Sequence, residues 1–292
     1  MKLALKIDVD TLRGTAEGVP RLVEVLKKQG AGATFLFSVG PDHTGRALRR
    51  VFRKDFLKKV SRTSVLEHYG MRTLLYGTLL PGPDIGRRGA DVMRAVRDAG
   101  FEVGVHCWDH VRWQDFVTRR DADWTEREMQ RARQRFTEVF QQEPKTWGAA
   151  GWQLNRHAAW YEERHFAYAS DTRGTRPFRP LWDGVAIGCP QLPTTLPTLD
   201  ELIGLHHDVV QHLLSRTGNG DHVFTAHAEL EGGKLMPMFE ALLAGWKAQG
   251  YELVALETLY HALDPARLPR CEVLQGTVPG RSGTLALQGE AA

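Results

Sequence analysis

The chain has 292 residues, of which 42% are hydrophobic and 25% are charged, with a formal net charge of +3. This composition is typical of a globular protein with a sizeable core, and so mild a charge does not by itself indicate nucleic-acid binding. No apolar run is long enough to predict a transmembrane helix, and no signal sequence precedes the first predicted strand. Three widely spaced cysteines argue against a disulfide framework or a zinc knuckle. We therefore expect a cytoplasmic protein with one large or two small α/β domains.

Two aspartates, Asp8 and Asp10, end the apolar N-terminal stretch that predicts the first strand. Residues two apart on a strand point to the same face. A protein tolerates two such carboxylates where a cation lies between them or where one acts as a base. An Asx-turn that caps the loop holding Gly14 explains the pair equally well. Ionisable residues at the ends of other strands would favour a site over a turn.

Strand and helix patterns then alternate along the chain. The predicted strands cover residues 33–39, 101–105, 146–150, 167–170, 222–226 and 251–255. The predicted helices cover residues 19–28, 91–99, 125–140 (with Thr125 as N-cap and Glu128 completing a capping box), 154–166, 206–214, 234–249 and 258–263. Repeated βα units predict a parallel sheet. About seven repeats suit a closed or nearly closed barrel, in which the chemistry lies at the carboxyl ends of the strands.

Three segments depart from this rhythm. Residues 41–88 form an insert after the second strand, in which cationic side chains alternate with apolar ones and an apolar stretch follows. This pattern favours an interfacial membrane contact through residues 46–80 over a solvated basic helix face, and it disfavours nucleic acid because few aromatic residues could stack on bases. Residues 174–200 predict a long ordered loop that shapes the pocket. From residue 265 the periodicity is lost, which predicts a domain over residues 1–264 and a flexible tail over 265–292.

Ionisable residues follow four of the predicted strands. They are Asp8 and Asp10, His106 and His110, Asp171, and His227. On a helical turn, histidines four apart share one face, a recurrent spacing for a divalent metal. Adding Asp10 gives a site with open positions for water and substrate. Each residue alone has a structural explanation, such as a loop histidine bonded to a carbonyl or an aspartate that begins a turn, but their joint placement favours a site.

The chemistry that fits this set is metal-assisted hydrolysis of an amide. A divalent ion polarises the carbonyl and lowers the pKa of water bound to it. Asp8 can accept the proton of the water, and His227 can protonate the leaving amine while Asp171 orients it or holds its charge. Two histidines and one aspartate suit zinc, cobalt, manganese or nickel, so the metal stays open, as does the oligomeric state.

These motifs resemble those of the polysaccharide deacetylase (NodB-homology) family, over residues 1 to about 262. The matching residues are Asp8-Val9-Asp10, His106-Cys107-Trp108-Asp109-His110, Ser170-Asp171 and Thr225-Ala226-His227. The resemblance implies a distorted (β/α)7 barrel and a metal-dependent enzyme that removes acyl groups from sugars. It implies Asp8 as base, Asp10, His106 and His110 as metal ligands, and His227 as general acid.

One branch of the family is more similar, on residues 6–15, 18–20, 37–42, 149–152 and 170–178. It removes the formyl group from 4-deoxy-4-formamido-L-arabinose linked to undecaprenyl phosphate, in the lipid A modification that lowers affinity for polymyxin. This implies a peripheral protein of the inner membrane. The alternatives are a deacetylase of a soluble N-acetylated glycan of the peptidoglycan or chitin type, and a binding module without catalysis.

The chain departs from the family pattern in two places. Val9 separates the two aspartates, which are adjacent in the wider family. The third motif of the family carries an arginine that positions the base, but here the corresponding residues are Ala149-Ala150-Gly151-Trp152. Arg173 or Arg179 could replace that charge. We expect the substrate to contact Arg13, Trp152, Arg173 and Arg179.

Overall fold

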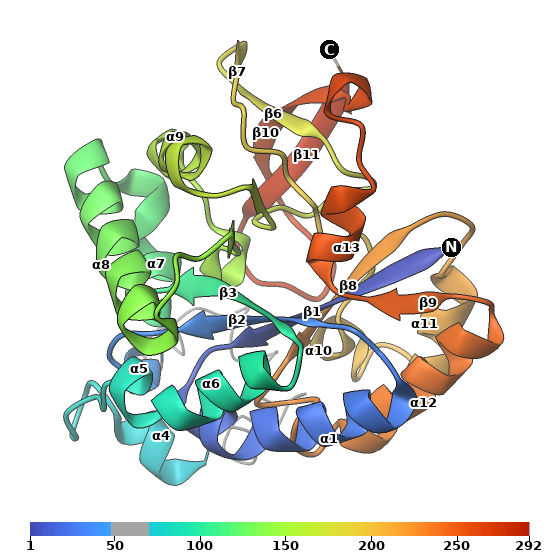
Figure 1. Cartoon of the computed structure of the whole chain (residues 1–292), viewed down its shortest axis with the longest axis horizontal. Helices are drawn as coiled ribbons and strands as arrows, with labels where there is room; N and C mark the ends of the chain where they lie inside the picture. Colours follow the sequence, from blue (N-terminus) through green and yellow to red (C-terminus); the bar gives the residue numbers. More distant parts are fainter. Residues whose placement is uncertain (48–69, 292) are drawn as a thin grey trace.

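A seven-stranded sheet of parallel strands forms the centre of the molecule (Figure 1). The structure is a computed structural model that describes residues 1–47 and 70–291. The strands are β1 (Lys2–Val9), β2 (Thr34–Ser38), β3 (Glu102–Cys107), β4 (Thr146–Trp147), β5 (Tyr168–Ala169), β8 (His222–His227) and β9 (Glu252–Val254). Their order is β5-β4-β3-β2-β1-β8, and β9 pairs with the first residues of β1. All seven predicted strands are present, which confirms the parallel α/β fold.

The central strand β1 separates the hydrophobic core from the interior of the barrel. Leu3, Leu5, Ile7 and Val9 belong to the main apolar cluster, whereas Lys6 and Asp8 between them are buried polar residues. Because side chains alternate along a strand, these polar residues share the opposite face. The carboxyl end of β1 therefore directs its charged side chains to the barrel interior.

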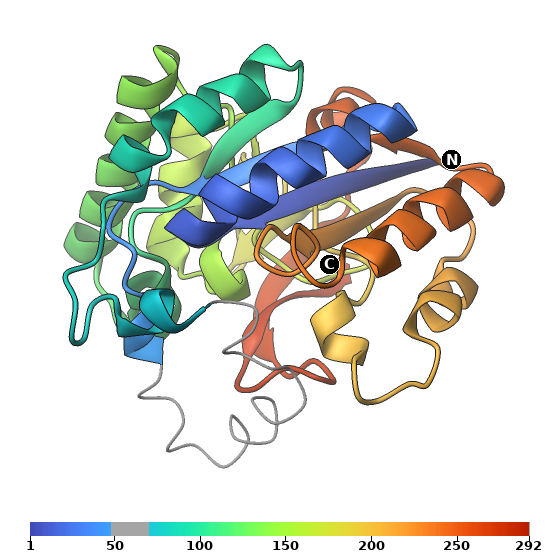
Figure 2. The same cartoon turned by 90° about the horizontal axis from the view of Figure 1, so that it is seen from below.

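Long helices cover the outer face of the sheet. They are α1 (Val19–Gln29), α6 (Ala90–Asp98), α8 (Ala122–Phe140), α9 (Arg156–His165) and α12 (Met236–Ala248). Figure 2 shows α1 and α12 side by side across the strands. Shorter helices are α4 (Met71–Leu75), α5 (Ile85–Arg88), α7 (His110–Phe116), α10 (Leu199–Leu202), α11 (Val209–Arg216) and α13 (Leu256–His261). Within residues 1–47 and 70–291, no helix has the length and apolarity needed to cross a membrane.

An irregular segment closes the barrel between β5 and β8. The amide of Leu192 donates to the carbonyl of Ala169 in β5 (2.8 Å), and the amide of Thr195 donates to that of Val223 in β8 (3.0 Å). The hydroxyls of Thr194 and Thr225 are also hydrogen-bonded, at 2.7 Å. The predicted loop over residues 174–200 therefore takes the place of a strand, which explains why the barrel is distorted.

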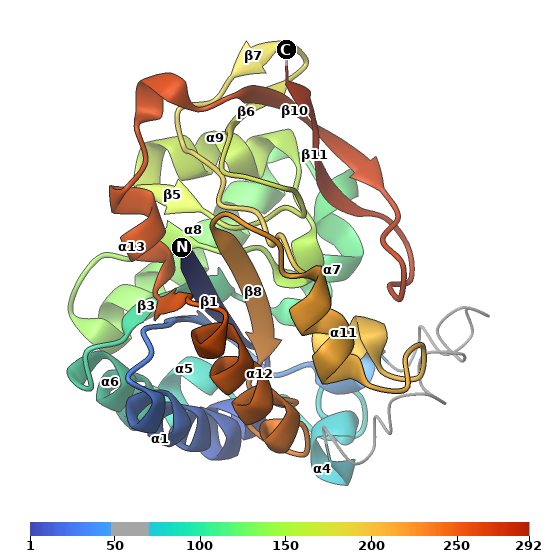
Figure 3. The same cartoon turned by 90° about the vertical axis from the view of Figure 1, so that its right-hand side faces the viewer.

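The prediction of a flexible tail over residues 265–292 was wrong. Residues Arg270–Gly276 form β10 and Leu285–Ala291 form β11, an antiparallel hairpin in which Cys271 and Leu285 are buried. β10 pairs with β6 (Arg179–Trp182), which pairs in turn with β7 (Val185–Ala186). In Figure 3 the hairpin folds against the barrel. Its strands are stabilised by pairing with a distant segment, which local periodicity cannot reveal.

Several predicted boundaries also differ from the structure. Helix α8 begins at Ala122, because the side chain of Asp121 rather than Thr125 caps it by accepting from the amide of Trp124 (2.9 Å). His106 lies in β3 and His110 begins α7, so the two histidines do not share a helical turn. The proposed membrane segment over residues 46–80 is described only in part, since its cationic residues from Arg49 to Arg62 lie outside the described residues.

Candidate active site

Three predicted metal ligands come together at the carboxyl ends of β1 and β3, which lie on either side of β2. Nε2 of His106 lies 3.3 Å from Oδ1 of Asp10, and Nε2 of His110 lies 3.4 Å from Oδ2 of the same carboxylate. One donor atom from each residue lies within 4.8 Å of the other two. Asp10 directly follows β1, and His106 lies in β3. The side chain of Asp109 caps α7 by accepting from the amide of Arg112, which fixes the helix that carries His110.

The hydrogen bonding of His106 fits a bound cation. Its Nδ1 lies 2.6 Å from the carbonyl oxygen of Gly148 and must donate to it, because a carbonyl can only accept. In the neutral imidazole, Nε2 therefore carries a lone pair, and it faces the carboxylate of Asp10. A donation from the second ring nitrogen to a backbone carbonyl is usual for metal-ligating histidines. A cation between these two facing acceptors would stabilise the arrangement, and the three residues could hold a divalent metal.

The charges around Asp10 favour its ionised form. Burial alone would raise the pKa of Asp10, but His110, His106 and His227 together hold it well below its usual range. The pKa of His106 is raised, since Asp8 and Asp10 outweigh the effect of burial. A carboxylate that stays charged beside two imidazoles is suited to coordinate a cation.

The predicted base Asp8 lies beside this cluster and is almost completely buried. Its Oδ1 lies 3.8 Å from Nδ1 of His106, and its Oδ2 lies 3.7 Å from Nζ of Lys6. The ammonium group of Lys6 donates to the carbonyl of Ser170 at 2.7 Å. Asp8 therefore occupies a position between the candidate metal ligands and a buried cation.

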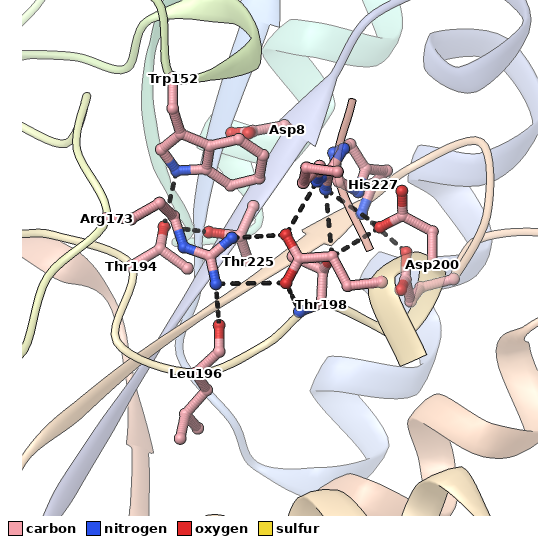
Figure 4. A network of polar contacts seen from close by, with 12 residues as sticks. Asp8, Trp152, Arg173, Thr194, Leu196, Thr198, Asp200, Thr225 and His227 are labelled. Carbon is pink, nitrogen blue, oxygen red and sulfur yellow. Dashed lines mark hydrogen bonds and ion pairs between the residues drawn. The ribbon is translucent and has the colours of Figure 1, made fainter. Parts of the chain in front are cut away.

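The predicted acid His227 ends β8, the neighbour of β1 on the side away from β2. Its amide donates to Oε2 of Glu231 at 2.7 Å. The His227 ring meets the ring of Trp152 edge-on, with the centroids 6.3 Å apart. Figure 4 shows Asp8, Trp152 and His227 grouped around the end of the strands. The parallel register that pairs Asp8 with His227 brings these two residues to the same level of the barrel.

Comparison with known proteins agrees with this arrangement. A family model described as polysaccharide deacetylase matches residues 3–165. The chain belongs to the polysaccharide deacetylase family. It is 37% identical to a Shewanella sediminis protein named as the 4-deoxy-4-formamido-L-arabinose-phosphoundecaprenol deformylase ArnD, over 98% of this chain and 94% of that protein. A protein of the same name from Wigglesworthia glossinidia brevipalpis is 30% identical, over 94% of this chain and 98% of that protein.

Solved structures of the polysaccharide deacetylase family share the fold. A Mycobacterium smegmatis protein described as a polysaccharide deacetylase has a TM-score of 0.63 at 15% identity, over 95% of both chains. A family 4 carbohydrate esterase from Streptomyces lividans, solved with acetate, has a TM-score of 0.51 at 13% identity, over 99% of this chain and 98% of that one. The predictions of the family, of the distorted barrel and of an enzyme that hydrolyses an amide bond are confirmed.

The hydrogen bonds of Asp171 differ from the predicted contact with His227. Among the described residues, no hydrogen bond or ion pair joins it to His227. Its carboxylate instead accepts from the amide of Ala149 and from Nε2 of Gln191, both at 2.6 Å. Burial raises the pKa of Asp171. The residue therefore joins the loop that carries Trp152 to the segment that closes the barrel.

The predicted substrate residues separate into two groups. Trp152 is buried in the wall of the site, with a positive φ of 53° that its surroundings must enforce. Arg13 lines a cavity of about 250 Å³ that also includes Arg21, Glu229 and Lys234. Arg173 also lies at this wall, with its guanidinium 5.1 Å from the ring centroid of Trp152. The guanidinium of Arg173 is bonded to Glu201, and Arg179 lies on β6 in the second sheet, so neither arginine replaces the charge expected beside Asp8.

Sequence reasoning missed two buried glutamates beyond His227, which are Glu229 and Glu231. Oε1 of Glu229 accepts from the amides of Asp10 (3.1 Å) and Thr11 (2.8 Å) and from the hydroxyl of Thr11 (2.7 Å), which fixes the turn after β1. Gly14 packs so closely that a Cβ there would lie 1.9 Å from this oxygen. Burial raises the pKa of Glu229 well above its usual value. The only sequence signal was the placement of acidic residues just after a strand end.

Proposed function

We propose that this polysaccharide deacetylase is a metal-dependent deformylase that hydrolyses the formamide of 4-deoxy-4-formamido-L-arabinose linked to undecaprenyl phosphate. The observation that supports it most is the cluster of Asp10, His106 and His110, whose donor atoms lie within 4.8 Å of one another beside Asp8. The similarity over 98% of the chain to a protein named as such a deformylase supports the choice of substrate. The product would enter the lipid A modification that lowers affinity for polymyxin.

The residues of the site divide the reaction between them. Asp10, His106 and His110 would hold the metal, for which zinc, cobalt, manganese and nickel all suit the donor set. Such an ion polarises a carbonyl and lowers the pKa of water bound to it. Asp8 accepts a proton from the attacking water, and His227 donates one to the nitrogen as the C–N bond breaks. Water and the formamide are thereby converted to formate and a free amine.

A polyprenyl-phosphate substrate requires the enzyme to reach a membrane surface. We propose that residues 46–80 dock on the anionic lipid of the cytoplasmic face of the inner membrane, with no role for nucleic acid. The side chains of Met71 and Leu79, on the described flank of this segment, are 69% and 82% exposed. Each cationic side chain near an anionic surface contributes about 1 kcal/mol to binding.

Co-sedimentation with vesicles containing phosphatidylglycerol tests this docking. Neutralising Arg49, Arg50, Arg53 and Lys54 to glutamine should release the protein into the supernatant. The matched control neutralises four cationic residues outside this segment and should stay with the vesicles. They are Lys27 and Lys28 in α1, Arg216 in α11 and Lys247 in α12. If both variants sediment as the parent protein does, the docking proposal is wrong.

A deacetylase of a soluble N-acetylated glycan is the second candidate. It is supported by the similarity in fold to an esterase solved with acetate, which extends over 99% of the chain. The two substrates can be compared in one assay for free amines, with the formamido-arabinosyl lipid in mixed micelles and a chitin-type oligosaccharide in solution. We expect amine release from the lipid alone. Release from the oligosaccharide alone would favour the second candidate.

A further inference from the structure

We infer that Lys6 is a positioning residue that holds the carboxylate of Asp8 in place for proton transfer, an inference that rests on the proposed function. Lys6 lies two residues before Asp8 on β1, on the same face of the strand. Its side chain is completely buried, and Nζ lies 3.7 Å from Oδ2 of Asp8. The strand that supplies the base therefore also supplies a cation beside it.

The surroundings of Lys6 fix its ammonium group at this position. Nζ donates to the carbonyl of Ser170 at 2.7 Å and lies 5.5 Å from the ring centroid of Trp152. A Cβ at Gly148 would lie 2.3 Å from Cδ1 of Leu36 and 3.3–3.4 Å from Cε and Nζ of Lys6, so the backbone at Gly148 packs closely against both side chains. The carbonyl of Ser170, the ring of Trp152 and the backbone at Gly148 therefore restrict where the ammonium group can lie.

A buried lysine needs such partners, because removing a charge from water is costly unless it is paired. An apolar residue would fill the same space without that cost. The barrel nevertheless keeps a cation here, within 4 Å of the carboxylate that the mechanism uses. This placement indicates a role in the reaction in addition to packing.

The two oxygens of Asp8 have different environments. Oδ2 faces Lys6, whereas Oδ1 is buried and, among the described residues, accepts no hydrogen bond. Oδ1 faces Nδ1 of His106 at 3.8 Å, but that N–H is already donated to the carbonyl of Gly148. An ion pair on Oδ2 orients the carboxylate and leaves Oδ1 available to accept a proton. The loop of residues 149–152 contains no cationic residue that could do the same.

The test compares Lys6→Met with Lys6→Arg. Removing a general base costs about 10²–10⁴ in rate, and we expect Lys6→Met to lower kcat by about 10²-fold with KM and bound metal close to those of the parent protein. Lys6→Arg keeps the charge and should recover about tenfold or more of the lost kcat. The control Lys145→Met removes a surface lysine paired with Glu257 and should leave kcat unchanged.

A double-mutant cycle separates positioning from packing. If Lys6 acts through Asp8, Lys6→Met should have little further effect on kcat in an Asp8→Asn protein. An equal loss in both backgrounds, or a fully metallated Lys6→Met with the parent kcat, would overturn the inference. Should Lys6→Met fail to fold, Lys6→Gln replaces it, because glutamine can still donate to Ser170 without carrying a charge. Parent kcat in a folded Lys6→Gln would overturn the inference equally.

The same assays distinguish this inference from the proposed function. If the parent protein releases no amine from the formamido-arabinosyl lipid, the proposed function is wrong. The Lys6 variants are then compared on 4-nitrophenyl formate, a small ester whose hydrolysis needs the same activated water. A loss confined to variants without a charge at position 6 would still support the role of Lys6, and equal rates would refute it.

Discussion

The guanidinium of Arg281 lies 4.7 Å from the ring centroid of Trp152, although the two residues are far apart in the sequence. Arg281 belongs to the turn between β10 and β11, and its Nε donates to Oε1 of Glu201 at 2.8 Å. Arg173 shares the same carboxylate (Figure 4). Burial would raise the pKa of Glu201, but Arg281 and Arg173 outweigh it and lower that pKa. The C-terminal hairpin is thus tied to the wall of the candidate site.

Replacing Arg281 with methionine should therefore affect both stability and activity. Hydrogen bonds to charged groups contribute about 1.5–3 kcal/mol, so we expect a decrease of that order in the free energy of unfolding. Urea unfolding measures this decrease, and kcat/KM should fall because Trp152 loses a neighbour. Arg267→Met, at an exposed position just before the hairpin, is the control. Identical unfolding curves for Arg281→Met and the parent protein would show that the hairpin is not coupled to the site.

Asp10→Asn should lose the metal and the activity together, because asparagine removes the negative charge that the candidate metal site requires. Elemental analysis of the purified variant is the measurement. His207→Gln changes an exposed histidine outside the cluster and should keep the full metal content. Stoichiometric metal in Asp10→Asn would remove Asp10 from the set of ligands.

Asp8→Asn should have the opposite combination of effects. If Asp8 is the base rather than a ligand, the variant keeps its metal but loses about 10²–10⁴ in kcat. Elemental analysis and kcat on the same preparation decide the point. Loss of metal from Asp8→Asn would assign the two aspartates differently from our account.

Glu231 should make stability depend on pH. Burial raises the pKa of this carboxyl from 4.5 to about 8 in the folded protein. The folded state therefore favours the neutral acid, and the stability it gains is fully present below pH 4.5 and is lost as pH rises toward about 8. The slope contributed by one proton is at most about 1.4 kcal/mol per pH unit. Glu231→Gln keeps an acceptor for the amide of His227 and should show a shallower decrease in unfolding free energy. Parallel curves for the two proteins would contradict this.

The strands and most long helices could be predicted because their apolar periodicity is local. Asp10, His106 and His110 could be predicted as a group because parallel strands end at the same edge of a sheet. The hairpin of β10 and β11 could not, since its stability depends on pairing with β6. Lys6 was also missed, because a lysine in an apolar strand gives no sign that it is buried beside a carboxylate.

The metal dependence of deformylation tests the central claim most directly. Purified protein would be treated with a chelator, dialysed, and assayed for free amine on the formamido-arabinosyl lipid before and after one equivalent of a divalent metal is added. Our account predicts that chelation abolishes amine release and that zinc, cobalt, manganese or nickel restores it in the parent protein but not in His106→Ala. Undiminished release from the metal-free protein would contradict it.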